Sequence, residues 1–494
     1  MNPEYIERFN TTLGYSLEQS AKEITIWYKK LKAAYEIKNS DENPNIDNDI
    51  TVMEIYVLVL YTIIAIATFF RGDFNSEYAA EKRLNLKYLR FVSAELYKSL
   101  FIIKKSNSLW HKLESILSIG NHTSLIEIIE EVNQASSRFQ TEYFDSNRRN
   151  ISIHYDTDLD VVYSHLCEIS EEDEAKHMAS LLAILQPLSL VCSSYLYSAY
   201  PHATTTSTIL NENGMLKKFR RELYGYIYDI TGSNLQSFAK HLDHNMQSFH
   251  LIERPKVREL LTEETHSRLS QFRECFKLGI LLHYFYLDLG TAVRGYLRAE
   301  NYYEQQFNVI RVNLIIYEGY KKVFLPQNDV LNMSLWERYI KTPILATTHT
   351  EYSEEVNAIE QILLGYSQNN DIKNIRHNFS HFKRGNILPI IDLWDSVTTI
   401  NPIEELNKAL DFLKLIARII KLSKPCLEYF SQKEHESTQQ RLTAPLETVF
   451  IKAMNSCKTK DDEEKLQSLK NELKKTVLET FDKMIQSHKC NKHE

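Results

Sequence analysis

Short matches between the two parts of the chain recur in a fixed order, and they constrain the fold more than any other feature. Thr68–Gly72 (TFFRG) returns in the second part as Thr291–Gly295 (TAVRG). At the same offset, Glu81 matches Glu304, Asn85 matches Asn308, and Glu95–Phe101 matches Glu318–Phe324. Ser108–Trp110 returns as Ser334–Trp336 at a slightly larger offset. An ordered series whose offset grows slowly indicates a tandem duplication, so the fold should contain two copies of one unit.

The composition predicts that this unit is helical. Only 12 Gly and 11 Pro occur in 494 residues, about half the usual share of each. Few turn-forming residues imply long uninterrupted elements, and apolar side chains recur at three- and four-residue spacing from the first segment onward. We predict helices at about 5–38, 51–71, 75–104, 107–119, 122–140, 158–169, 171–199 and 402–422, with a polar loop at 39–49.

The duplication and the helical pattern together predict a domain organisation. We expect an all-α chain with two tandem helical bundles, followed by a C-terminal helical tail. The predicted divisions are 1–50 (N-terminal helix and loop), 51–200 (first bundle), 201–261 (linker and bridging helical segment), 262–435 (second bundle) and 436–494 (charged C-terminal helix). Lys and Glu at helical spacing from about 444 to 490 are typical of a solvated or oligomerising helix.

The most apolar run of the chain, 55–70, is short for a membrane span. Its counterpart at 278–293 contains His283 and Asp288, which a span would tolerate poorly. We therefore predict that both runs are buried core helices. The N-terminus lacks a signal-peptide pattern and the six cysteines are scattered, so we expect a cytoplasmic protein with free thiols and no membrane partner.

A second duplicated pattern carries chemistry. Arg149 is followed by Asn150 and, five positions after the Arg, by His154; Arg376 is followed by His377 and His381 in the same way. The spacing between the two copies continues the series of slowly growing offsets. One such Arg-x4-His pattern is expected by chance about once in a chain of this composition. A pair within a duplication is more informative, and we interpret the two copies as equivalent motifs of the two units.

The residue types suit cleavage of RNA without a metal. On a helix, positions four apart share a face, so Asn150 would project beside His154, and His377 beside His381. An imidazole can take a proton from a ribose 2′-hydroxyl or give one to the leaving 5′-oxygen. A guanidinium can hold the phosphate and stabilise the charge that develops on it. We predict as catalytic Arg149, Asn150, His154, Arg376, His377 and His381.

This pattern resembles the HEPN superfamily of ribonucleases, in which Arg-x4-His with a polar residue after the Arg lies late in a helical domain. Asn150 fits the usual Arg-Asn start, and His377 is a less common variant. The resemblance implies HEPN-like bundles at residues 51–200 and 262–435 that form an intramolecular pseudo-dimer, and one composite cleft built by both motifs. It also implies 2′,3′-cyclic phosphate and 5′-hydroxyl products, no cofactor, and a role as a toxin or in anti-phage (antiviral) defence.

Several other residues are candidates for a functional role but also have an ordinary structural explanation. Basic side chains near the motifs and in the bridging segment could bind RNA, or could be ordinary surface charges: Arg148, Lys383, Arg384, Lys217, Lys218, Arg220 and Arg221. His377 and His381 have the spacing of two zinc ligands, but no third ligand follows, so we predict no metal. We interpret the repeated Arg71/Arg294 and Glu95/Glu318 as ion pairs inside each bundle.

Two other functions are consistent with the same sequence. One is a compact RNA-guided nuclease similar to those of type VI CRISPR systems, although a net charge of −7 argues against it. The other is a catalytically silent helical module that binds RNA or a protein. Expected partners are an RNA substrate, a regulatory RNA or an antitoxin-like inhibitor, and a second copy of the chain through the C-terminal helix.

Overall fold

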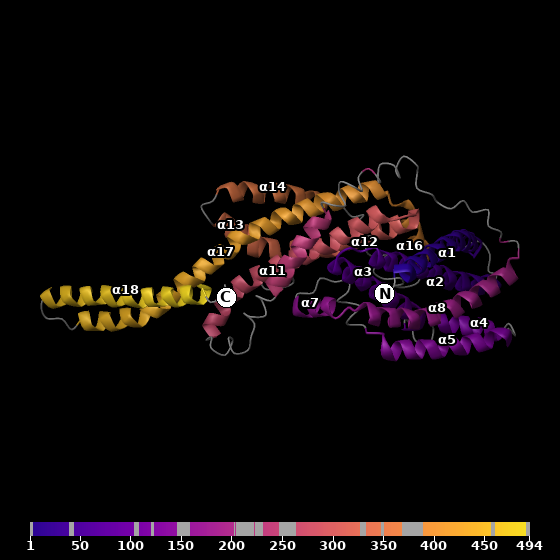
Figure 1. Cartoon of the computed structure of the whole chain (residues 1–494), viewed down its shortest axis with the longest axis horizontal. Helices are drawn as coiled ribbons and strands as arrows, with labels where there is room; N and C mark the ends of the chain where they lie inside the picture. The colour runs from indigo at the N-terminus through magenta and orange to yellow at the C-terminus, as the bar shows by residue number, and fades with distance from the viewer. Residues whose placement is uncertain are drawn as a thin grey trace.

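The structure is a computed structural model of the whole chain (Figure 1). It describes residues 3–38, 44–102, 108–119, 123–145, 159–201, 203, 222, 231–246, 263–326, 332–346, 350–367, 389–455 and 460–490. Within these residues the secondary structure is helical and contains no strand, so the predicted all-α class is confirmed.

The helices of the first half, residues 1–200, are α1 (Pro3–Lys38), α2 (Pro44–Phe74), α3 (Ala79–Tyr97), the π-helical turn η1 (Lys98–Ile102), α4 (Leu109–Ile119), α5 (Thr123–Glu142), α7 (Leu159–Cys167) and α8 (Glu171–Ala199). Those of the second half, from residue 263, are α11 (Glu263–Arg298), α12 (Tyr302–Phe324), η3 (Glu337–Lys341), α13 (Thr342–Leu345), α14 (Thr350–Ser367), α16 (Pro389–Thr399) and α17 (Pro402–Met454). The last helix is α18 (Lys460–Cys490).

Three predicted boundaries are wrong. Helix α2 begins at Pro44, inside the predicted loop, because proline suits the first turn of a helix and Asp47 is acidic there. Helix α17 does not end near residue 422 but continues through Pro425 and Pro445 to Met454. The boundary predicted at residue 435 therefore falls inside one continuous helix. The tail predicted as one helix over 444–490 is two, because α17 ends at Met454 and α18 begins at Lys460.

The two apolar runs are buried helices, as predicted. Nearly all of residues 55–70 in α2 and 278–293 in α11 are buried. By length and composition, 46–74 and 172–199 could cross a membrane, but 89% of the apolar window of the first and 39% of that of the second are buried inside the protein. The side chains around α2 thus supply the apolar environment that its sequence requires.

The two halves meet through a core of four helices. Helix α2 packs on α3 and α11 packs on α12, and each of these pairs also packs on the other: α2 contacts α12, and α3 contacts α11. Helices α3 and α12 begin at Ala79 and Tyr302, which are equivalent positions of the sequence repeat. The contacts between the halves are therefore reciprocal, as at the interface of a symmetric dimer.

Ion pairs across this core are reciprocal residue by residue. Arg71 bonds Glu300 and, at 2.5 Å, Glu304 of the second half. Arg294, the repeat counterpart of Arg71, bonds Glu77 at 3.1 Å and Glu81 at 3.2 Å in the first half. Glu77 and Glu81 are in turn the repeat counterparts of Glu300 and Glu304. Our interpretation of Arg71 and Arg294 as partners inside each bundle is wrong, because both arginines bind carboxylates of the opposite half.

A series of four aromatic rings also occurs twice. In the first half Trp110 lies 5.7 Å from Phe101, Phe101 5.1 Å from Tyr97, and Tyr97 5.1 Å from Phe139, between ring centroids. The second series is Trp336–Phe324 at 6.4 Å, Phe324–Tyr320 at 5.5 Å and Tyr320–Tyr366 at 6.4 Å. Corresponding rings of the two series are separated by the offsets of the sequence repeat, so the packing of each half follows the duplication.

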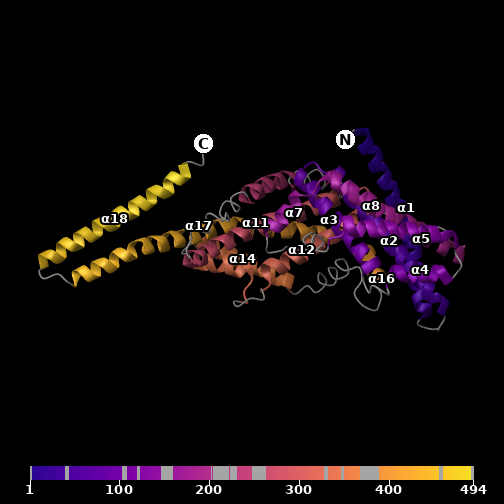
Figure 2. The same cartoon turned by 90° about the horizontal axis from the view of Figure 1, so that it is seen from below.

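The end of α17 and α18 form a two-helix arm that projects from one end of the body in both views (Figures 1 and 2). Glu447 of α17 ties the arm together through Lys470 at 2.5 Å and Lys474 at 3.3 Å on α18. Large apolar side chains stay exposed on it, namely Val449, Ile451, Leu469 and Leu473. Two helices that project from the body can cover only part of each other's apolar side chains, so the remaining apolar side chains stay in contact with solvent.

Candidate functional site

All the site residues predicted from the sequence lie outside the described residues. These are the catalytic candidates Arg149, Asn150, His154, Arg376, His377 and His381, and the RNA-binding candidates Arg148, Lys383, Arg384, Lys217, Lys218, Arg220 and Arg221. The structure does describe what borders the two motifs. The first motif falls between α5 and α7, and the second between α14 and α16.

The helix that follows each motif packs on the opposite half. Helix α7 contacts α3 and also α11 of the second half, whereas α16 contacts α12 and also α1 and α2 of the first half. Asp395 of α16 accepts a hydrogen bond from Tyr28 of α1 and lies 3.3 Å from Lys32. Helices α7 and α16 lie apart from each other in both views (Figures 1 and 2). A shared site thus requires the segments 146–158 and 368–388 to meet across the interface.

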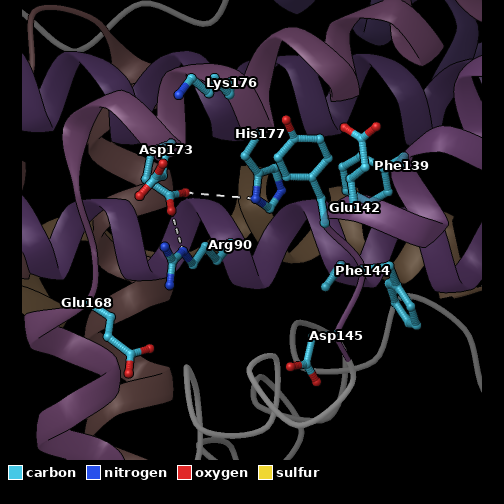
Figure 3. Close-up of a pocket in the computed structure, with 12 residues that line it drawn as sticks. Arg90, Phe139, Glu142, Phe144, Asp145, Glu168, Asp173, Lys176 and His177 are labelled. Atoms are coloured by element: carbon cyan, nitrogen blue, oxygen red, sulfur yellow. Dashed lines mark hydrogen bonds and ion pairs between the residues drawn. The ribbon is translucent and has the colours of Figure 1, made fainter.

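A pocket of about 450 Å³ lies at the border of the first motif (Figure 3). One wall is the end of α5 and the chain that follows it up to Asp145, shortly before Arg149; the opposite wall comes from α3 and α8. Its described lining is Arg90, Ala94, Phe139, Glu142, Tyr143, Phe144, Asp145, Glu168, Asp173, Glu174, Lys176 and His177. This volume is within the range of small-molecule sites. The pocket was not predicted from the sequence. Glu174 and His177 lie three positions apart on a predicted helix, and this spacing could have indicated a carboxylate and an imidazole on one face.

Arg90 is the cation at the centre of this pocket. Its Nε bonds the buried carboxylate of Glu174 from α8. Its Nη1 is buried and has no hydrogen-bond partner among the described residues. In Figure 3 the guanidinium is directed at the space between Glu168 and Asp145. A buried donor without a partner is costly. Arg90 Nη1 would therefore be stabilised by a hydrogen-bond acceptor that is not among the described residues, such as one on a ligand in the pocket.

His177 is held as a neutral imidazole. Ser93 Oγ lies 2.9 Å from the Arg90 carbonyl oxygen and 2.8 Å from His177 Nε2. The other ring nitrogen, Nδ1, lies 3.9 Å from Oε2 of Glu174, which is too far for a hydrogen bond. Burial lowers the pKa of His177 to about 3, and the charge of Arg90 acts in the same direction. The ring is thus uncharged at neutral pH.

The positions of the second half that are equivalent to these pocket residues hold different side chains. Helices α8 and α17 can be aligned on their N-caps, which are Ser170 and Asn401. In this alignment Glu174 and His177 correspond to Glu405 and Lys408, which form an ion pair of 2.7 Å. At the offset that relates α3 to α12, Arg90 corresponds to Asn313. At these described positions the second half therefore has neither the guanidinium nor the imidazole that line the pocket of the first.

The neutral state of His177 predicts a pH dependence of stability. The folded-state pKa lies below the unfolded value of about 6.5, so the unfolded chain binds more protons below pH 6.5. Stability is then fully present above pH 6.5 and falls as the pH drops towards 3, by up to about 1.4 kcal/mol per pH unit. Between pH 7.0 and 5.5 the wild type should lose about 1.3 kcal/mol more than His177→Gln in urea unfolding. Equal losses in both proteins would contradict this.

No protein-family model, curated protein or solved structure matches the chain. The resemblance to HEPN ribonucleases therefore depends on the two motifs and their setting. In the part of the chain that the structure describes, no group of three or more His, Cys, Asp and Glu side chains could hold a metal ion.

Proposed function

We propose that this chain is a metal-independent endoribonuclease of the HEPN type, in which Arg149, His154, Arg376 and His381 act at one composite site. Asn150 and His377 would orient the two imidazoles from the same helix faces. The proposal includes a pseudo-dimer of two HEPN-like bundles within one chain. Its biological setting would be anti-phage defence or toxicity, with an RNA or protein inhibitor as a partner.

One observation carries the proposal. The last rings of the repeated aromatic series, Phe139 and Tyr366, precede Arg149 and Arg376 by the same number of positions. The two halves thus pack in register up to the helices that precede both motifs. This supports reading Arg149 and Arg376 as equivalent positions of one duplicated unit, not as two chance matches.

The reciprocal interface supports the shared site. Arg71 and Arg294 each bind carboxylates of the opposite half, and such reciprocal ion pairs are what a symmetric dimer of two equivalent units would have. Helices α7 and α16, next to the motifs, each pack on the opposite half. In such an arrangement one imidazole could act as base towards the 2′-hydroxyl and the other as acid towards the 5′-oxygen.

The direct test is cleavage by the purified full-length chain in EDTA. We expect cuts in RNA, no cuts in DNA of the same sequence, and products with 2′,3′-cyclic phosphate and 5′-hydroxyl ends, because the 2′-hydroxyl is the nucleophile. Loss of RNA cleavage in EDTA, or equal cleavage of DNA, would refute the proposed chemistry. Co-purification of one discrete small RNA would favour the guided-nuclease alternative instead.

The C-terminal arm is the surface that we propose for self-association. Leu469 and Leu473 lie one helical turn apart on α18, exposed on one face, and a second arm could cover them in a four-helix bundle. Light scattering should give a dimer for the wild type and a monomer for Leu469→Glu/Leu473→Glu. The matched control Gln467→Glu/Ser468→Glu places two charges at exposed positions of the same helix and should stay dimeric. A monomeric wild type would rule out this interface.

A further inference from the structure

We propose that the pocket between α3, α5 and α8 binds a nucleobase of the RNA, and that it selects guanine. This inference rests on the proposed ribonuclease function, because the pocket borders the first motif at Asp145. It adds a specificity-determining residue, Arg90, that belongs to neither motif.

The charge of the lining argues for a base and against a phosphate. The described lining has carboxylates at Glu142, Asp145, Glu168, Asp173 and Glu174, and cations at Arg90 and Lys176. Since His177 is neutral, the carboxylates outnumber the cations, and a phosphate would be repelled. An uncharged planar ligand meets no such repulsion.

The walls of the pocket suit a flat aromatic ring. Tyr143 and Phe144, which are partly exposed, line the α5 side, where base–aromatic contact is favourable for any base. Phe139 is buried behind them. Phe139 and Tyr143 also pack against the His177 ring, at 5.3 and 5.4 Å between centroids, which fixes their positions. Ala94 on α3 has a small side chain, which leaves room between these walls.

The polar atoms distinguish guanine from the other bases. Arg90 Nη1 is a buried donor without a partner among the described residues, and its side chain is nine-tenths buried. Guanine presents two adjacent acceptors, O6 and N7, to such a guanidinium, whereas adenine places an amino donor beside N7. The carboxylates of the lining are acceptors for the guanine N1–H and amino groups.

Binding of nucleosides tests the inference without any cleavage. By titration calorimetry, the full-length chain should bind guanosine at least tenfold more tightly than adenosine or cytidine, as expected for one correct guanidinium contact. Arg90→Lys keeps a cation beside Glu174 but loses the fork, and should remove most of this preference. Ala94→Leu fills the pocket and should abolish binding, whereas Ala183→Leu, at an exposed position of α8, should not.

The outcomes separate this inference from the proposed function. His154→Ala should lose RNA cleavage yet keep guanosine binding, since the groups that we propose to contact guanine, Arg90 and the described carboxylates, belong to neither motif. Guanosine bound no better than adenosine, or unchanged binding by Arg90→Lys and Ala94→Leu, would overturn the inference and leave the nuclease proposal standing. Competition by inorganic phosphate would show that the pocket recognises an anion and is not a base site.

Discussion

Replacing either His154 or His381 with alanine is expected to lower the rate of RNA cleavage by about 1,000-fold. If the two motifs form one site, each imidazole performs one of the two proton transfers, and the remaining one cannot perform both. The double variant should therefore be little worse than either single variant, because residues that act as a unit give non-additive losses. Single-turnover cleavage of a labelled RNA in EDTA measures all three.

Other arrangements of the two motifs predict different cleavage rates for these variants. Two independent sites, which the separation of α7 and α16 would accommodate, predict that each single variant keeps about half of the activity and that only the double variant is inactive. A silent binding module predicts no cleavage by the wild type. The control is His244→Ala, which removes an exposed imidazole from the helix at 231–246 and should cleave like the wild type.

The repeat was the most reliable guide from sequence to structure. The matches of Arg71 with Arg294 and of Glu81 with Glu304 gave the correct pairs of equivalent positions. They did not reveal which residues would be partners, because a repeat is equally consistent with contacts inside a unit and contacts between units. The structure resolves this in favour of pairs between the halves, and Glu77 and Glu300 join the set although the sequence comparison did not single them out.

The pocket of the first half was not predictable in the same way. Arg90 and His177 come from helices that are distant in the sequence, and their repeat counterparts, Asn313 and Lys408, are different residues. Aligning the two halves therefore does not detect Arg90 and His177, since such an alignment finds only residues that are the same in both copies. Likewise, the length of α17 was missed because Pro425 and Pro445 are signals for helix ends, and tertiary packing overrode them.

Replacing Asp288 with asparagine is expected to destabilise the protein by about 3–5 kcal/mol. Asp288 is fully buried on α11 and accepts from Lys87 of the first half at 2.6 Å and from Arg311 at 3.1 Å. Asparagine would leave two buried cations without a counter-charge. Urea unfolding at pH 7 measures the loss, and Asp411→Asn, in an exposed pair with Lys414, is the matched control with an expected change below about 1 kcal/mol.

The pH dependence and a second variant identify the cause as electrostatic. Burial alone would raise the pKa of Asp288, but Lys87 and Arg311 outweigh burial and lower it. Its stabilising effect is thus fully present above the unfolded pKa of about 3.9 and is lost only as the pH falls further. The difference in free energy of unfolding between the wild type and Asp288→Asn should therefore begin to shrink only below about pH 4. Lys87→Met added to Asp288→Asn removes one of the two stranded cations and should restore part of the stability. If the double variant is no more stable than Asp288→Asn, the loss came from packing, and the buried charges across the two halves do not hold them together.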